Sequence, residues 1–186
     1  YEGNHLAQFP LDIFQTGSGT STNMNMNEVI SSLSSTEVDS VHPNDHVNMG
    51  QSSNDVIPSA INVDSSLTVV NQLLPSMTHL KNSIDEKAKS IGDIPKNGRT
   101  HLMDAMPVTF AQEMSAWSAQ INDAMEQYQV LLTKLQQLAI GGTAVGTGVN
   151  ADPNLAKQCC IHMNKLTGME FRPANNSFQA ISSQDA

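Results

Sequence analysis

The most regular feature of this sequence is an apolar seam in which hydrophobic residues recur at alternating steps of four and three. Such spacing places the side chains on one face of a helix, so it predicts a long helix from Ser53 to Ile91. Pro58 lies in the first turns, where proline is tolerated, whereas Pro75 predicts a kink because proline cannot donate a main-chain hydrogen bond. Lys81 fills the one gap in the seam, whose apolar members are Val56, Ala60, Val63, Leu67, Val70, Leu74, Met77, Ile84, Ala88 and Ile91.

A second long helix with the same alternation follows after a break. Residues 92–107, with two prolines and Gly98, interrupt the pattern, and we predict an irregular connection there. The glycine-rich residues 141–148 end the second helix. Its seam consists of Met114, Ser118, Ile121, Met125, Tyr128, Leu132, Leu135 and Ala139.

Shorter helices are predicted on either side of these two. One covers residues 23–33, and another, over residues 152–166, opens with an Asp-Pro pair typical of an N-cap followed by proline. Residues 34–50 are rich in Ser, Asp and Asn and indicate a loop. The predicted fold class is therefore all-α, an elongated long-helix bundle. Its uncovered apolar seams predict a helical partner.

Composition and charge exclude several classes of function. The chain has 9 Lys and Arg against 18 Asp and Glu, a formal net charge of −9, which argues against nucleic acid or an anionic membrane as its partner. No apolar run reaches the length of a membrane span. Cys159 and Cys160 are adjacent and provide no disulfide framework, so a reducing cytoplasm is the expected compartment. An acidic chain can still bind an anion through hydroxyl groups and helix N-termini.

The first of three polar clusters spans residues 16–23, which alternate glycines with hydroxyl side chains. Glycine lets the backbone approach a ligand, and hydroxyl groups are neutral donors for a carboxylate. A flexible Ser/Gly loop that caps a helix is the alternative interpretation. A P-loop is excluded because no Gly-Lys-Ser/Thr sequence follows.

The second cluster lies at the start of the first long helix. Ser52, Ser53 and Asn54 fall where free N–H groups and the helix dipole favour an anion, although ordinary N-capping explains the same residues. His42 and His46 have a metal-like spacing of four, but the intervening proline and the lack of an HExxH pattern argue against zinc. We predict no metal site.

The third cluster, residues 98–105, lies in the break between the two long helices and contains His101. A histidine held in such a break can serve as a general base near neutral pH. An ordinary loop or interface histidine is the alternative.

Taken in order, these clusters resemble the fumarase/aspartase superfamily along nearly the whole chain. Within it, Gly-Ser-Gly-Thr at 17–20 and Gly-Arg-Thr-His at 98–101 resemble the class II fumarases, because aspartases typically have Gly-Ala-Gly and a Gln at the corresponding places. Four ordered stretches are far more specific than any one of them. They cover residues 9–29, 41–55, 98–107 and 141–150.

This resemblance implies an all-helical chain of the fumarase/aspartase fold, whose long helices join a multi-helix core in a homotetramer with composite active sites. Residues 1–49 would end an N-terminal lyase domain, and residues 50–186 would begin the central helical domain. The family's mobile serine loop, and the glutamate partner of its catalytic histidine, would lie beyond Ala186. The chain is therefore expected to be a central fragment that is inactive alone.

The resemblance also implies a reaction, the reversible hydration of fumarate to L-malate in the tricarboxylic acid cycle, with a small dicarboxylate as substrate and no metal or organic cofactor. His101 would be the catalytic residue that activates water. Thr100 would contact the substrate, as would two groups, Ser18, Gly19 and Thr20, and Ser52, Ser53 and Asn54. A second anion site would contain His42, Asn44 and Asp45.

Two other functions stay open at this point. An aspartate ammonia-lyase would share the fold, and substrate preference would separate it from a fumarase. A non-catalytic helical assembly module would keep the fold without the chemistry.

Overall fold

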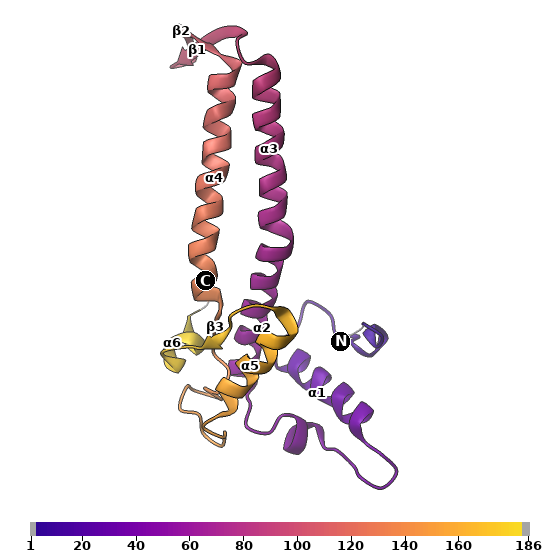
Figure 1. The fold of residues 1–186 in the computed structure, drawn as a ribbon. Coiled ribbons are helices and arrows are strands. Elements are labelled where there is room, and N and C mark those ends of the chain that lie inside the picture. The colour runs from indigo at the N-terminus through magenta and orange to yellow at the C-terminus, as the bar shows by residue number, and fades with distance from the viewer. Residues whose placement is uncertain (1–2, 184–186) are drawn as a thin grey trace. The chain divides into compact units, whose positions relative to one another are not determined.

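The computed structural model describes residues 3–183; residues 1–2 and 184–186, the outer ends of the two predicted domain ranges, lie outside the described part. The chain divides into a first unit, residues 1–64 with 135–186, and a second unit, residues 65–134. Helices make up most of the described chain (Figure 1), so the predicted all-α class is confirmed. No helix in residues 3–183 is both long and apolar enough to cross a membrane. The predicted domain boundary near residue 50 stays a prediction.

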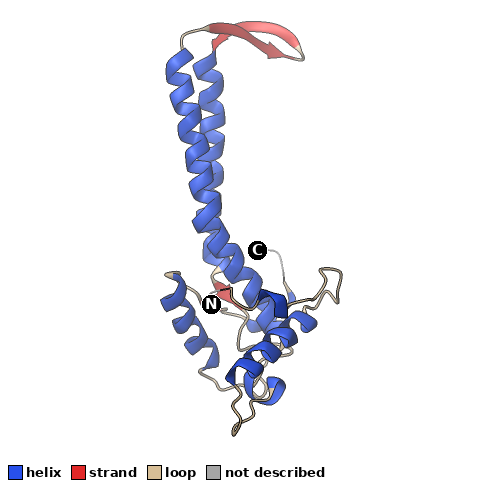
Figure 2. Cartoon of the chain, turned by 90° about the vertical axis from the view of Figure 1, so that its right-hand side faces the viewer, coloured by secondary structure: helices blue, strands red, loops and turns tan. Residues whose placement is uncertain are grey.

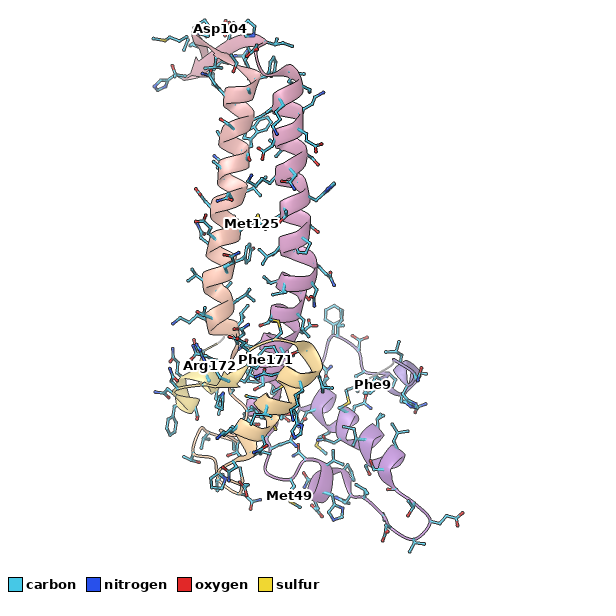
Figure 3. The ribbon with its side chains drawn as sticks, in the orientation of Figure 1. Phe9, Met49, Asp104, Met125, Phe171 and Arg172 are labelled. Atoms are coloured by element: carbon cyan, nitrogen blue, oxygen red, sulfur yellow. The ribbon has the colours of Figure 1, made fainter. Side chains whose placement is uncertain are left out.

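The second unit is built on a helical hairpin. Helices α3 (Leu74–Ile91) and α4 (Phe110–Leu135) lie side by side and antiparallel, as Figures 1 and 2 show from two directions. Met125 lies on the side of α4 that faces α3 (Figure 3). The predicted seam positions on both helices are half-buried, except for Ser118 and Leu135 on α4, which are buried. The predicted seam is confirmed, and its burial is partial because each helix has a single neighbour within this unit.

The predicted long helix from Ser53 to Ile91 is irregular just before Pro75, where a kink was predicted. Helix α2 (Ser53–Thr68) is followed by a π-helical segment, η3 (Val69–Leu73), and α3 begins directly after it. Proline at position 75 cannot donate to the carbonyl one turn earlier, and its ring crowds that carbonyl. A π-helical turn relieves both effects by widening the turn just before the proline.

The connection between α3 and α4 is a β-hairpin, which corrects the prediction of an irregular break. Strands β1 (Pro95–Thr100) and β2 (Met103–Thr109) pair antiparallel, with Pro95 opposite Thr109 and Thr100 opposite Met103. Prolines are tolerated in such a two-stranded ribbon because each strand has an edge that needs no N–H donor. The register shifts between Asn97 and Arg99, so Gly98 lies at a bulge, where a Cβ would stand 2.6 Å from the Met106 carbonyl oxygen.

A polar contact interrupts the seam between α3 and α4. The Lys81 Nζ lies 2.9 Å from Asp85 Oδ2 on the next turn of α3. A hydrogen bond from Ser118 on α4, and then the Lys81 ammonium, lower the pKa of the Asp85 carboxyl below its ordinary value. Polar groups in an otherwise apolar seam fix the alignment of two helices, because only one alignment pairs them.

We expect this contact to make the second unit less stable in acid. Because the pKa of Asp85 is lowered in the folded chain, its contribution is present above the unfolded pKa of about 4 and is lost as the pH falls through the folded pKa. An Asp85→Asn variant should therefore melt below the wild type at pH 7, and the difference should shrink at pH 3. Thermal unfolding followed by circular dichroism measures this, with Asp123→Asn, an exposed carboxylate on α4, as the control. A difference that is the same at both pH values would contradict the expectation.

The first unit contains the remaining helices, with residues 53–64 of α2, and two short parallel strands. They are η1 (Leu6–Gln8), α1 (Thr20–Ser34), the π-helical turn η2 (Pro43–Val47), α2, α5 (Leu155–Thr167) and α6 (Ser177–Ser182). The strands are β3 (Gln137–Leu138) and β4 (Arg172–Pro173). The turn η2 corrects the prediction of a plain loop over residues 34–50. Helix α5 begins after the predicted Asp-Pro opening, with Asn154 as its N-cap, and ends one residue beyond the predicted residue 166, with Gly168 as its C-cap.

The hydrophobic core of this unit is small. Leu138, Cys160 and Phe171 form it, each no more than 3% exposed, and Figure 3 labels Phe171 beside α5. Asn164 holds both main-chain groups of Phe171: its Oδ1 accepts from the N–H at 2.7 Å and its Nδ2 donates to the carbonyl at 2.9 Å. Burial, and then the adjacent Cys159, raise the pKa of the Cys160 thiol to about 11. For Cys159 burial, and then the charge of Asp55, raise the pKa.

Candidate functional site

The first polar cluster forms the turn that opens α1. Gly19 is the N-cap of the helix and has a φ of 71°, a conformation that glycine adopts without strain. Its Cα also approaches α2 so closely that a Cβ would stand 2.8 Å from the Ile57 side chain. Ser18 and Thr20 are exposed, with their hydroxyl oxygens 3.2 Å apart. The turn thus presents two hydroxyl groups on either side of a glycine that packs against α2.

A side chain at position 19 should therefore be costly. We expect Gly19→Ala to lower the free energy of unfolding by about 1–3 kcal/mol, from left-handed backbone strain and from overpacking against Ile57. Gly17→Ala is a matched control, because a Cβ there meets nothing within 4 Å. Urea unfolding of both variants measures the difference. Equal stability of the two variants would show that the approach of Gly19 to Ile57 is not tight.

The second cluster caps α2. Ser52 lies directly before the helix, and its Oγ accepts from the Asn54 N–H at 3.2 Å, while Asp55 Oδ1 accepts from the Ser52 N–H at 3.0 Å. This is the reciprocal arrangement of a capping box, with Asp in place of the usual Glu or Gln. The capping interpretation is thus confirmed, and it holds Ser53 and Asn54 on the first turn of the helix.

Three asparagines support this turn from α1 and from the loop before α2. The buried Asn23 donates from Nδ2 to Ser53 Oγ at 3.1 Å and to Asn48 Oδ1 at 3.2 Å, and the buried Asn27 donates to the same Asn48 oxygen at 3.0 Å. Within residues 3–183 the Ser53 oxygen accepts a hydrogen bond and no acceptor takes its proton. The hydroxyl proton of Ser53 therefore stays available to an anion. Sequence reasoning gave these asparagines no role.

The glycine-rich stretch after α4 lies against the same turn. Asp55, which is 0% exposed, accepts with Oδ2 from the N–H groups of Gly141 at 3.0 Å and Thr143 at 2.8 Å. Asn54 Nδ2 donates to the Ala144 carbonyl at 2.8 Å. Three of the four sequence stretches thus meet in the first unit. Asp55 was missed as a site residue, although an acid three positions into a capped helix is the signal that could have found it.

The residues of the predicted second anion site lie on and before η2. His42 Nδ1 accepts from the Asp45 N–H at 3.1 Å and lies 3.4 Å from Asp45 Oδ2, while His46 Nδ1 accepts from the His42 N–H at 2.8 Å. His42, Asn44 and Asp45 are exposed. Both histidines thus use Nδ1 locally and leave Nε2 for a ligand. In residues 3–183 no group of three or more His, Cys, Asp or Glu side chains is placed to hold a metal ion.

Thr100 and His101 belong to the second unit, at the end of the β-hairpin. Thr100 is the last residue of β1, and His101 and Leu102 form the turn with φ values of 48° and 61°. Two consecutive left-handed residues are typical of a type I′ turn, which is strained when neither residue is glycine. The His101 side chain is exposed. Strained turns that persist often mark functional sites.

Side-chain contacts brace this hairpin. Asp104, labelled in Figure 3, accepts from Asn97 Nδ2 at 3.0 Å and lies 3.3 Å from the Arg99 Nε, so it ties the two strands together. At the other end, Lys96 Nζ lies 2.7 Å from both Glu113 carboxylate oxygens and 5.5 Å from the Phe110 ring centre. Phe110 and Glu113 belong to the first turns of α4. The turn that presents His101 is therefore fixed to a helix.

Comparison with known proteins identifies the family to which the chain belongs. The profile of a family described as Lyase matches residues 1–186. The chain belongs to this lyase family. Curated relatives include a class II fumarate hydratase of Xylella fastidiosa, 51% identical over 98% of this chain, and one of Bacillus subtilis, 45% identical over 99%. The predicted membership of the fumarase/aspartase superfamily is confirmed, and both of these relatives are named class II fumarate hydratases.

Solved structures agree with this lyase assignment. A class II fumarase from Schistosoma mansoni has a TM-score of 0.91 with 40% identity over 97% of this chain, and a fumarate lyase:delta crystallin from Brucella melitensis has 0.89 with 34% identity over 98%. The predicted fold is thus confirmed. The chain spans 39% of the Xylella relative, 41% of the Bacillus relative and 42% of the Schistosoma chain.

Proposed function

We propose that the polypeptide to which this chain belongs is a fumarate hydratase that interconverts fumarate and L-malate. The observation that carries the proposal is the meeting of three sequence stretches around the capped end of α2, where the Ser53 hydroxyl lies and where Gly19 brings the turn with the Ser18 and Thr20 hydroxyls against Ile57. Neutral donors of this kind can bind a carboxylate even in a chain with a net negative charge. The choice of fumarate as the dicarboxylate follows the names of the relatives.

The chemistry needs stabilisation of negative charge. Removal of a proton next to a carboxylate of malate gives an aci-carboxylate, which holds more negative charge on the carboxylate oxygens than the ground state does. Fixed donors from Ser18, Thr20, Ser53 and Asn54, aimed at those oxygens, would stabilise this intermediate more than the substrate. Loss of hydroxide as water then yields fumarate, and the reverse path adds water to the double bond.

His101 would act on the water and Thr100 would contact the substrate. An imidazole at the end of a braced turn can accept a proton from water when fumarate is hydrated and return it in the reverse direction. The proton acceptor for the carbon-bound hydrogen is proposed to lie outside this chain, as is an acidic partner for His101. His42, Asn44 and Asp45 are proposed as a second anion site.

A homotetramer with composite active sites is part of the proposal, as is a location in the cytoplasm. The apolar side chains of the β-hairpin support the assembly, because Leu102 is 97%, Met103 69% and Met106 79% exposed. Apolar groups gathered at a single hairpin are best explained by cover from another chain or segment. The half-buried seam of α3 and α4 supports the same conclusion.

An ultraviolet assay for fumarate on the whole protein tests the function, with L-malate in one cuvette and L-aspartate in another. Fumarate from malate alone is the expected result. Fumarate from aspartate alone would replace the proposed activity by an aspartate ammonia-lyase. No fumarate from either substrate would favour a non-catalytic helical assembly protein.

A further inference from the structure

The carboxylate of Asp55 lies at the centre of the candidate site, yet it is too deeply buried to touch a ligand. It is 0% exposed, and three main-chain N–H groups, from Ser52, Gly141 and Thr143, donate to it at 2.8–3.0 Å. A buried charge is costly unless it is fully hydrogen-bonded, and this one is satisfied without a basic side chain among those donors. Three charge-assisted hydrogen bonds are thus concentrated on this one carboxylate.

The two oxygens of Asp55 hold different segments. Oδ1 accepts from Ser52 and completes the cap of α2, whereas Oδ2 accepts from Gly141 and Thr143, which lie 86 and 88 residues further along the chain. Asn54 adds a bond from its Nδ2 to Ala144 on the same stretch. The rotation of the Asn54 amide is therefore set by where Asp55 holds the glycine-rich stretch.

We propose that Asp55 is the positioning residue of the carboxylate-binding site: it clamps residues 141–144 against the first turn of α2, and thereby fixes the directions in which Ser53 and Asn54 present their donors. This inference rests on the function proposed above. Loss of the clamp should weaken dicarboxylate binding more than it slows the chemical step, because Asp55 touches no reacting atom.

The test uses the whole protein and succinate, an unreactive dicarboxylate. In Asp55→Asn the amide NH₂ replaces one acceptor oxygen, so it faces N–H donors that it cannot satisfy. We expect the Kd for succinate, measured by calorimetry, and the KM for malate to rise at least tenfold, while kcat falls less. Hydrogen exchange at the amides of residues 141–143 should become faster in the same variant.

Ser59→Ala is the matched control. Ser59 is buried one turn further along α2, and its hydroxyl donates only within the helix, to the Asp55 carbonyl at 2.6 Å. We expect succinate to bind this variant within twofold of the wild type. An equal loss of affinity in Ser59→Ala would reduce the Asp55 effect to general destabilisation and would overturn the proposal.

Other outcomes are equally decisive. Unchanged succinate affinity in Asp55→Asn, with or without faster exchange at residues 141–143, overturns the positioning role, as does absence of succinate binding by the wild type. If Asp55→Asn does not fold, Asp55→Glu keeps the charge but displaces it by one methylene, and wild-type affinity in that variant overturns the proposal. A wild type that binds succinate but makes no fumarate from malate refutes the proposed function alone, and the succinate comparison still decides the role of Asp55.

Discussion

Replacing His101 by Asn in the whole protein should reduce kcat for malate dehydration by about a hundredfold or more, the usual loss when a general base is removed. The folded state should be unaffected. His101 is exposed, and asparagine tolerates its left-handed backbone (φ 48°) better than most residues do. Fumarate formation followed by absorbance, together with circular dichroism of the same sample, separates lost chemistry from lost structure.

Leu102→Asn is the control for this experiment, because it changes the neighbouring residue of the same turn. Leu102 has a φ of 61° and is 97% exposed, so asparagine should relax the turn there as well while keeping the imidazole. Because Leu102 also belongs to the proposed assembly surface, size-exclusion chromatography must first show that the variant keeps the oligomeric state of the wild type. We then expect kcat within a few-fold of the wild type. Full activity in His101→Asn would remove His101 from the mechanism. A large loss in both variants would assign the effect to the turn itself.

Replacing Phe171 by Ala should lower the free energy of unfolding of the first unit by about 3–5 kcal/mol, the usual cost of deleting a buried aromatic ring. Phe171 is 3% exposed and is the only aromatic member of the three-residue core within the described residues. The main-chain bonds from Asn164 hold the surrounding backbone, so the cavity cannot easily close. Urea unfolding followed by circular dichroism measures the change.

Phe14→Ala makes the same chemical change at a site that is 90% exposed, and it should alter the stability by no more than about 0.5 kcal/mol. A similar loss in both variants would contradict the assignment of the cost to the burial of the Phe171 ring. A small loss in Phe171→Ala would show that another side chain fills the space.

The long helices could be predicted from the sequence because helical periodicity is a local signal. The four-three spacing can be recognised without knowing which helix packs against the seam. Even the polar seam residues Lys81 and Ser118 are accounted for, because both form hydrogen bonds with Asp85. The β-hairpin could not be predicted in the same way. Residues 92–107 show no alternation, and pairing between Pro95 and Thr109 depends on the helices that bring the strands together.

The exposed and half-buried residues proposed for the site could be picked out from the sequence, whereas the buried residues that support them could not. Ser18, Ser53 and Asn54 belong to sequence stretches with a recognisable composition. The role of Asp55, in contrast, depends on hydrogen-bond donors that lie 86 and 88 residues further along the chain. Asn23 similarly depends on Asn48 and Ser53, which come from a loop and another helix. Long-range hydrogen bonds of this kind leave no periodic trace in a sequence.

The two adjacent thiols have a practical consequence for fluorescence work. Maleimide reagents react with the thiolate form of cysteine. Burial raises the pKa of Cys160 to about 11 and also raises the pKa of Cys159, so both side chains stay mostly in the thiol form. Near pH 7 the native pair should label slowly. A dye could then be attached to a cysteine introduced on the exposed hairpin, and its signal could be followed without first removing the native thiols.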